Sequence, residues 1–121
     1  MSNETETDEA IEMFRPVGQQ ELALIQESGY TAFPPRLSWQ PIFYPVLNEE
    51  YATQIARTWN ARGGNSGYVT RFRVRKDFLR RYDIHQVGSA IYKEYWIPAE
   101  DLEELNRSLV GTIEMIAEFR S

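Results

Sequence analysis

The amino-acid sequence predicts a compact, mixed α+β domain with a mainly antiparallel sheet and about three helices. Its 121 residues are enough for one hydrophobic core and too few for two. Strand-like and helical segments follow one another irregularly, without the regular alternation of a doubly wound parallel sheet. Gly63, Gly64 and Gly67 follow a helical segment and precede a strand, which is the reverse of a dinucleotide-binding turn. A Rossmann fold is therefore not expected.

The composition excludes several classes of protein. Hydrophobic residues make up 42% of the chain and aromatic residues 13%, as in globular proteins. No apolar run approaches the ~20 residues needed to cross a bilayer, and the N-terminus lacks the pattern of a secretory signal. We therefore expect a soluble, cytoplasmic protein that does not bind membranes.

Metal sites and thiol chemistry are not expected. The sequence has no cysteine and one histidine, His85, so zinc sites and cysteine nucleophiles are excluded. Carboxylates with the spacing of a calcium loop are also absent, and we expect no metal. His85 itself is expected to be a structural strand residue.

The charge is unevenly distributed along the chain. A net charge of −5 argues against nonspecific nucleic-acid binding, which depends on basic residues. Residues 1–12 are acidic and contain almost nothing to bury, so we expect a disordered tail before a single domain at residues 13–121. Residues 57–81 are locally basic. They form either a solvated strand and helix surface, which the alternation of Arg71, Arg73 and Arg75 favours, or a phosphate-binding surface.

The strands are indicated by short alternating or apolar runs between turn residues. They are expected at residues 13–17, 41–46, 68–74, 84–88, 90–97 and 112–119. The helices are indicated by apolar residues at helical spacing and by residues that begin or end a helix. They are expected at about 19–28, from Asn48 to Trp59 and at 98–110, with a single turn at 77–82.

The helix after Asn48 has the clearest pattern. Asn48 is a good N-cap, and acidic residues follow it in the first turn. Ala52, Ile55, Ala56 and Trp59 share one face at helical spacing. This pattern predicts that Trp59 is buried against the rest of the domain.

The order of these elements resembles the core of the ADP-ribosyltransferase-like fold. In that family an early strand ends in an Arg or His that holds the nicotinamide dinucleotide, and Phe14 to Gly18 resemble it. A later strand enters a helix capped by Asn, Ser or Thr, as in Ile42 to Ala52. A further strand carries a glutamate just ahead of a hydrophobic run, as Tyr92 to Pro98 do. The resemblance spans about residues 13–119.

The sequence is also similar to a group of small bacterial proteins, many of which carry the label ADP-ribosylation/crystallin J1. The shared stretches are Phe-Arg-Pro-Val-Gly, Phe-Pro-Pro-Arg-Leu, Gln-Pro-Ile-Phe-Tyr-Pro-Val and Trp-Ile-Pro-Ala-Glu. The label implies little chemistry, because the helical, metal-binding architecture usual for it does not fit a short mixed chain.

The transferase resemblance implies that the protein binds NAD and transfers ADP-ribose to an unknown target. Glu94 would be the catalytic carboxylate, which fixes a ribose hydroxyl and faces the positive charge that develops as nicotinamide leaves. Arg15 would hold a phosphate or ribose of NAD, and Tyr44 would stack on the nicotinamide ring. Arg15 and Glu94 are expected to lie across one cleft.

Each of these residues also has a structural interpretation. Glu94 lies beside Lys93 in an alternating segment, as exposed or paired surface residues do. Arg15 is equally suited to anchoring the acidic tail or a helix end, and Tyr44 to core packing. Trp39 lies among prolines, where it either packs beneath the loop or contacts a protein partner.

The sequence departs from the transferase family at two places. Tyr44-Pro45-Val46 occupies the place of the Ser-Thr-Ser element, and Tyr92 stands where a second Glu or Gln would precede Glu94. Modification of arginine is therefore disfavoured. Three functions remain open: an ADP-ribosyltransferase, a catalytically silent domain of the same fold that binds a protein or acts as an immunity-type partner, and an unrelated α+β interaction module.

Overall fold

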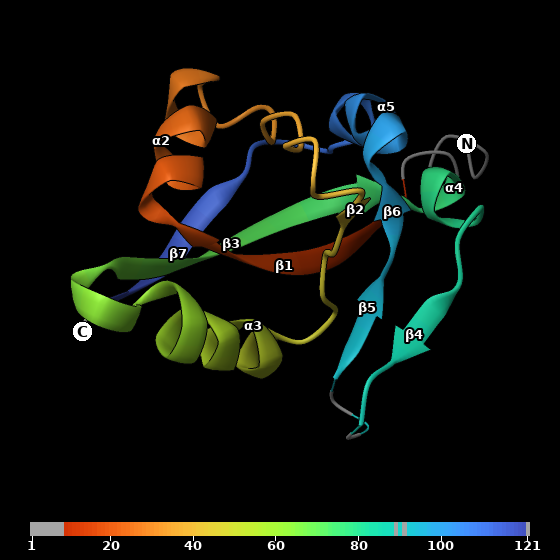
Figure 1. Ribbon diagram of the computed structural model, residues 1–121. Helices are drawn as coiled ribbons and strands as arrows, with labels where there is room; N and C mark the ends of the chain where they lie inside the picture. The colour runs from red at the N-terminus through yellow and green to blue at the C-terminus, as the bar shows by residue number, and fades with distance from the viewer. Residues whose placement is uncertain (1–8, 89, 91, 121) are drawn as a thin grey trace.

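A three-stranded antiparallel sheet forms the centre of the domain. The computed structural model describes residues 9–88, 90 and 92–120. Strand β3 (Ser66–Arg75) lies between β1 (Ala10–Gly18) and β7 (Glu114–Arg120), as Figure 1 shows. Because side chains alternate along a strand, the sheet has two faces, and each can bury apolar residues under a helix.

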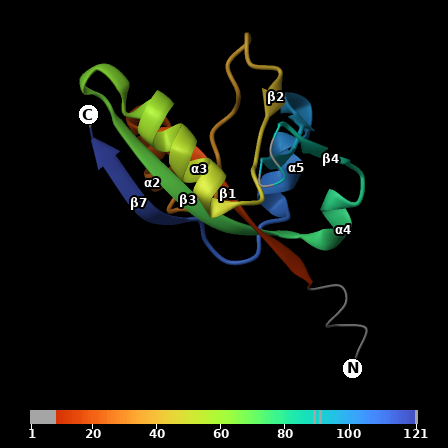
Figure 2. The same cartoon turned by 90° about the horizontal axis from the view of Figure 1, so that it is seen from below.

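Helices cover both faces of this sheet. α2 (Gln19–Glu27) lies on one face and α3 (Glu49–Ile55) on the other, in agreement between two views at right angles (Figures 1 and 2). α4 (Lys76–Leu79) follows β3 directly, and α5 (Leu102–Arg107) precedes β7. The α+β class and the mainly antiparallel pairing are confirmed, with four α-helices in the described part of the chain instead of about three. None of these helices is long and apolar enough to span a membrane.

Two short strand pairs extend the structure beyond the central sheet. β2 (Ile42–Phe43) pairs with β6 (Ile97–Pro98), and β4 (Ile84–Gln86) pairs with β5 (Lys93–Tyr95). The strand expected at 41–46 is thus shorter, and the strand expected at 90–97 is divided into β5 and β6. Proline accounts for part of this, because Pro41, Pro45 and Pro98 have no amide hydrogen to donate.

The two faces of the sheet carry separate cores. The larger core lies on the α2 side, and its members include Phe33, Phe43, Phe72, Ile97 and Leu105. The smaller core lies on the α3 side and consists of Phe14, Val46, Ala52, Ala56 and Val69. Because side chains alternate along β1, neighbouring residues of this strand contribute to different cores.

The ordered domain begins earlier than the sequence predicts. β1 starts at Ala10, and residues 10–12, which were assigned to the disordered tail, pair with β3. Ile11 lies opposite Val74, where it packs against the larger core. The basic residues of β3 offset the acidic character of Glu12, which lies within 3.9 Å of Arg71. Residues 1–8 of the expected tail lie outside the described residues, whereas Glu9 is described and forms an ion pair with Lys76.

The prediction that Trp59 is buried is wrong. The N-cap is confirmed, because Asn48 Oδ1 accepts a hydrogen bond of 3.1 Å from the amide of Tyr51. However, α3 ends at Ile55 and continues as a π-helical turn, Ala56–Asn60. The wider turn rotates later residues relative to the apolar face, and Trp59 is 66% exposed.

Candidate functional site

A cleft of about 570 Å³ opens beside the junction of β1 and α2. Most of its lining comes from residues 18–21, 34–37, 59–60 and 65–66, which belong to four separate parts of the chain. Its volume falls within the range of roughly 300–1,000 Å³ that is typical of small-molecule sites. The π-helical turn and the proline-containing loop both contribute to its wall, so its shape depends on tertiary packing.

Arg15 and Arg36 both lie near the carboxylate of Glu21 in this region, but only Arg15 forms an ion pair with it. Arg15 donates from Nε to Oε2 of Glu21 at 2.7 Å and from Nη2 to Oε1 at 3.0 Å. Both carboxylate oxygens are therefore paired with Arg15. The Arg15 and Arg36 guanidinium carbons lie 4.4 and 5.7 Å from the centroid of the Phe43 ring. The pairing leaves Arg36 without a carboxylate partner among the described residues.

Arg36 is held in an unfavourable electrostatic environment. Burial lowers the pKa of Arg36, and the nearby positive charge of Arg15 lowers it further, whereas Glu21 raises it. An arginine side chain nevertheless remains protonated. Arg15 and Arg36 together carry more positive charge than Glu21 carries negative charge at this point, which favours an anionic ligand.

Two buried polar atoms of the cleft residues lack hydrogen-bond partners. They are Nε of Arg36 and Oδ1 of Asn60, and no other described residue has such an atom. Both residues line the cleft. A buried donor or acceptor without a partner costs about 1–3 kcal/mol. Their shared location makes this wall of the cleft the candidate place for a polar ligand.

The mouth of the cleft combines a helix N-terminus with an aromatic ring. Gly18 is the N-cap of α2 and makes no side-chain capping bond, so the first amides of the helix have no capping side chain. Such amides favour anions. Trp59 presents an exposed indole, with the Arg62 guanidinium carbon 4.7 Å from its centroid. A planar group and an anionic group could bind here together.

Glu94 lies in a different environment. Its side chain is 8% exposed and accepts two hydrogen bonds, from the Tyr51 hydroxyl to Oε1 at 2.8 Å and from Trp96 Nε1 to Oε2 at 2.7 Å. Glu94 is thus neither an exposed surface residue nor part of an ion pair with any described residue. Its contacts tie β5 to α3.

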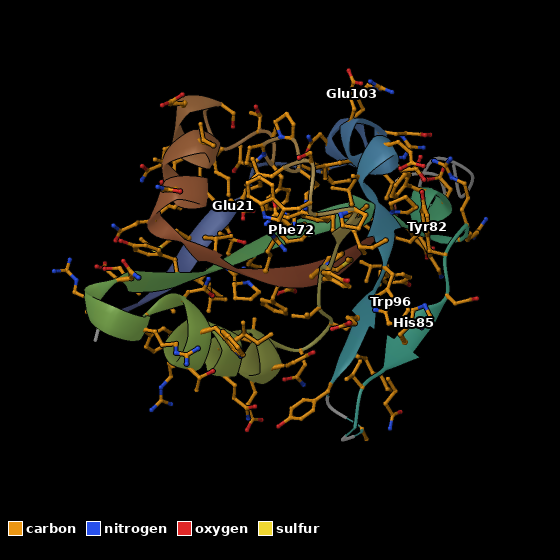
Figure 3. All side chains as sticks on the ribbon, viewed as in Figure 1. Glu21, Phe72, Tyr82, His85, Trp96 and Glu103 are labelled. Carbon is orange, nitrogen blue, oxygen red and sulfur yellow. The ribbon has the colours of Figure 1, made fainter. Side chains whose placement is uncertain are left out.

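The expectation that Arg15 and Glu94 lie across one cleft is wrong. Val46 bridges Phe14 on one side and Glu94 on the other. Paired residues of a sheet project to the same face, and Phe14 and Val46 pack on the α3 side. Arg15 follows Phe14 and therefore points to the α2 side. Figure 3 shows the same separation, with Glu21 beside α2 and Trp96 next to His85 at the β4–β5 hairpin.

Tyr44 is not a core residue, since it is 42% exposed. Its ring meets that of Trp96 edge to face, with the centroids 6.4 Å apart. Tyr44 therefore packs on Trp96, and it is also close enough to Arg36 to raise the pKa of that residue. Arg15 anchors the first turn of α2 through Glu21, which is the helix-end interpretation of that residue. The roles of these three residues in NAD chemistry remain predictions.

The basic segment 57–81 does not form a continuous phosphate-binding surface. Several of its cations are engaged in exposed ion pairs, namely Arg71 with Glu114, Arg75 with Asp77, Lys76 with Glu9 and Arg81 with Glu104. Exposed pairs of this kind contribute little to stability. The solvated-surface interpretation therefore describes most of this segment. Within the described residues, no group of three or more potential metal ligands gathers at one point.

The stability contributed by the Tyr51–Glu94 hydrogen bond should depend on pH. Burial, and then the hydrogen bond to Glu94, raises the pKa of Tyr51 from 10.0 to about 12. Because the folded-state pKa is raised, the associated stability is complete below pH 10 and is lost as the pH rises toward 12. We expect Tyr51→Phe to lower the free energy of unfolding by about 1–2 kcal/mol at neutral pH.

Urea denaturation at a series of alkaline pH values tests this expectation. The difference between wild type and Tyr51→Phe should shrink as Tyr51 ionises. Tyr82→Phe repeats the test at a second site, and its difference from wild type should shrink in the same way, since the pKa of Tyr82 is also raised to about 12, by burial and then by its hydrogen bond to Asp101. An unchanged difference across the alkaline range would contradict the assignment.

No family model matches the chain, and no match was found among curated proteins or solved structures.

Sequence analysis missed Arg36 and Asn60. Arg36 follows two prolines in a segment assigned as a connecting loop, and an arginine in such a rigid segment was the available signal. Asn60 follows the helical pattern and carried no separate signal, because the π-helical turn that places it in the cleft is not encoded by a recognisable motif.

Proposed function

We propose that this domain binds NAD, or a related nucleotide diphosphate, in the cleft that contains Arg36, and that it does so without transferring ADP-ribose. The observation that carries the proposal is the shared position of Arg36 and Asn60, whose unpartnered buried atoms need an acceptor and a donor. A nucleotide offers both, as phosphate oxygens and as N–H groups of the base or carboxamide.

The phosphate part of the ligand is assigned to Arg36 and the start of α2. The guanidinium group is suited to phosphate because its donors form a planar fork. Gly18 and Gln19 bring the first amides of α2 to the same cleft, where the helix dipole favours negative charge. Two independent groups of this protein thus favour an anion at one place.

The planar part of the ligand is assigned to the π-helical turn. The exposed indole of Trp59 offers a stacking surface, and Asn60 beside it offers an amide. Both come from Ala56–Asn60, so a shift of this turn would change stacking and hydrogen bonding together. A stacking role for the indole also accounts for the exposure of Trp59.

Binding without transfer is proposed because the predicted catalytic glutamate lies on the other side of the sheet. Glu94 faces α3, and both its oxygens already accept hydrogen bonds from neutral donors. To assist departure of nicotinamide, a carboxylate must face the sugar as it becomes cationic. A ligand in the Arg36 cleft would not present its ribose to Glu94.

Calorimetric titration with NAD tests the proposal. We expect Arg36→Gln to weaken binding at least ~10-fold, because it removes charge-assisted hydrogen bonds to phosphate. Arg107→Gln is the matched control, since this exposed arginine lies on α5 outside the cleft. An assay for nicotinamide release should detect none with wild type.

Three results would contradict the proposal in different ways. Equal NAD affinity in wild type and Arg36→Gln would place the ligand elsewhere. Release of nicotinamide by wild type but not by Glu94→Gln would restore the transferase hypothesis. Absence of binding at millimolar NAD would favour a second candidate, protein binding, which is supported by the exposure of Leu37 at 52% and Trp39 at 73%.

A further inference from the structure

The buried carboxylate of Glu94 has no cationic partner among the described residues. The residue is 8% exposed, and the two donors to its carboxylate, Tyr51 and Trp96, are both neutral. The raised pKa of Tyr51 keeps that hydroxyl protonated, so it donates a hydrogen bond but no charge. No lysine, arginine or histidine in the described chain forms an ion pair with Glu94. Burial of a charge is costly unless a partner offsets it.

Further aromatic residues contact the two donors to this carboxylate. The His85 ring stacks on Trp96 with the centroids 3.7 Å apart, and Figure 3 shows the two side chains together at the hairpin. Tyr44 meets Trp96 edge to face, and both rings are about half exposed, at 42% and 43%. Behind them, Tyr51 and Tyr92 contact each other with centroids 4.7 Å apart. Aromatic residues from three separate segments thus pack around the two donors to Glu94.

This combination selects one class of ligand. Aromatic faces attract cations, and they do so best when the cation is poorly hydrated, as substituted ammonium ions are. A hard metal ion instead requires several oxygen ligands, and Glu94 offers the only carboxylate in its immediate hydrogen-bonded cluster. The partly exposed rings of Tyr44 and Trp96 leave a surface on which the ligand can rest.

We propose that Glu94, Trp96 and Tyr44 form a binding site for an N-methylated ammonium group. Glu94 supplies the opposite charge, Trp96 positions the carboxylate through its indole N–H, and the exposed rings contact the methyl groups. Glu94 lies on the face of the sheet opposite Arg15, and neither Glu94 nor Trp96 lines the Arg36 cleft. A methylated lysine of a protein and a free quaternary amine offer the same chemistry.

Titration followed by NMR of the Trp96 indole N–H tests this site, with the resonance assigned from a Trp96→Phe sample. Choline is expected to shift the resonance, and its neutral tert-butyl isostere to bind at least ~10-fold more weakly, since only the charge differs. A peptide with trimethyllysine is titrated in parallel. Tighter binding of the peptide than of choline would identify a protein as the source of the ligand, and the reverse would identify a free amine.

Variants separate the charge from the aromatic surface. Glu94→Gln keeps a similar shape and an acceptor, and it should weaken choline binding at least ~10-fold. Glu27→Gln is the control, because Glu27 is exposed on α2. Tyr44→Ala removes only a half-exposed ring, so it should weaken binding even if Glu94→Gln fails to fold. Equal binding of choline and its neutral isostere, or unchanged affinity in Tyr44→Ala, would overturn the proposal.

Discussion

Phe43→Ala is expected to lower the free energy of unfolding by about 4 kcal/mol, as for other large buried aromatic residues. The Phe43 side chain is fully buried and contacts Phe33, with ring centroids 5.0 Å apart. It also lies beneath both guanidinium groups of the cleft. Its removal should therefore affect stability and anion binding together, because Arg15 and Arg36 lose the ring on which they rest.

Phe72→Ala separates these two consequences. Phe72 is equally buried in the larger core and contacts Phe33 at 4.8 Å, but it makes no cation–π contact with either arginine of the cleft. Its loss should destabilise the domain by a similar amount. Urea denaturation measures the free energy of unfolding of both variants. NAD titration at low temperature measures ligand binding by the folded fraction of each variant. If Phe72→Ala weakened NAD binding as much as Phe43→Ala, the specific role of Phe43 would be refuted.

Gly67→Ala is expected to destabilise the domain by roughly 3 kcal/mol, the upper part of the usual range for overpacking. A methyl group at Gly67 would lie 2.8 Å from Cβ of Asn60 and still closer to the carbonyl oxygen of Ala56. The obstacle is largely backbone, so it cannot move aside as a flexible side chain would. The π-helical turn must shift, and the cleft should lose ligand affinity with it.

Gly18→Ala is the matched control for Gly67→Ala. The two glycines lie opposite each other in the pairing of β1 with β3. A methyl group at Gly18 would come no closer than 3.8 Å to Asn60, and its extended backbone suits alanine. Thermal and urea denaturation should show a change of less than about 1 kcal/mol. Equal destabilisation by the two substitutions would show that the close approach of the π-helical turn is not what requires glycine at Gly67.

The sequence predicted those features that depend on neighbouring residues. Asn48 caps its helix as expected, because the capping bond reaches only as far as Tyr51. Gly29 follows α2 with φ of 76°, a conformation that glycine adopts without strain. The alternation at 68–74 correctly indicated β3. In each case the signal and the structure lie within a few residues of each other.

The candidate site depended on contacts between distant segments. The resemblance led to Arg15 and Glu94 as one site, but the bridge through Val46 places them on opposite faces of the sheet. Sequence periodicity cannot reveal this, since the segments that contain Phe14, Val46 and Glu94 pair with one another only when the chain folds. Arg36 likewise gains its importance because Arg15 takes both oxygens of Glu21.

By itself, the sequence determined the α+β class, the antiparallel character and the approximate order of the elements, because propensity, capping and alternation are local properties. Only the tertiary structure decided which side chains share a site. The clearest case is the π-helical turn, which packs directly over Gly67 and turns Trp59 outward. Helical spacing alone had placed that residue in the core, since a periodic pattern assumes a regular helix, and a single wider turn changes the direction of every side chain after it.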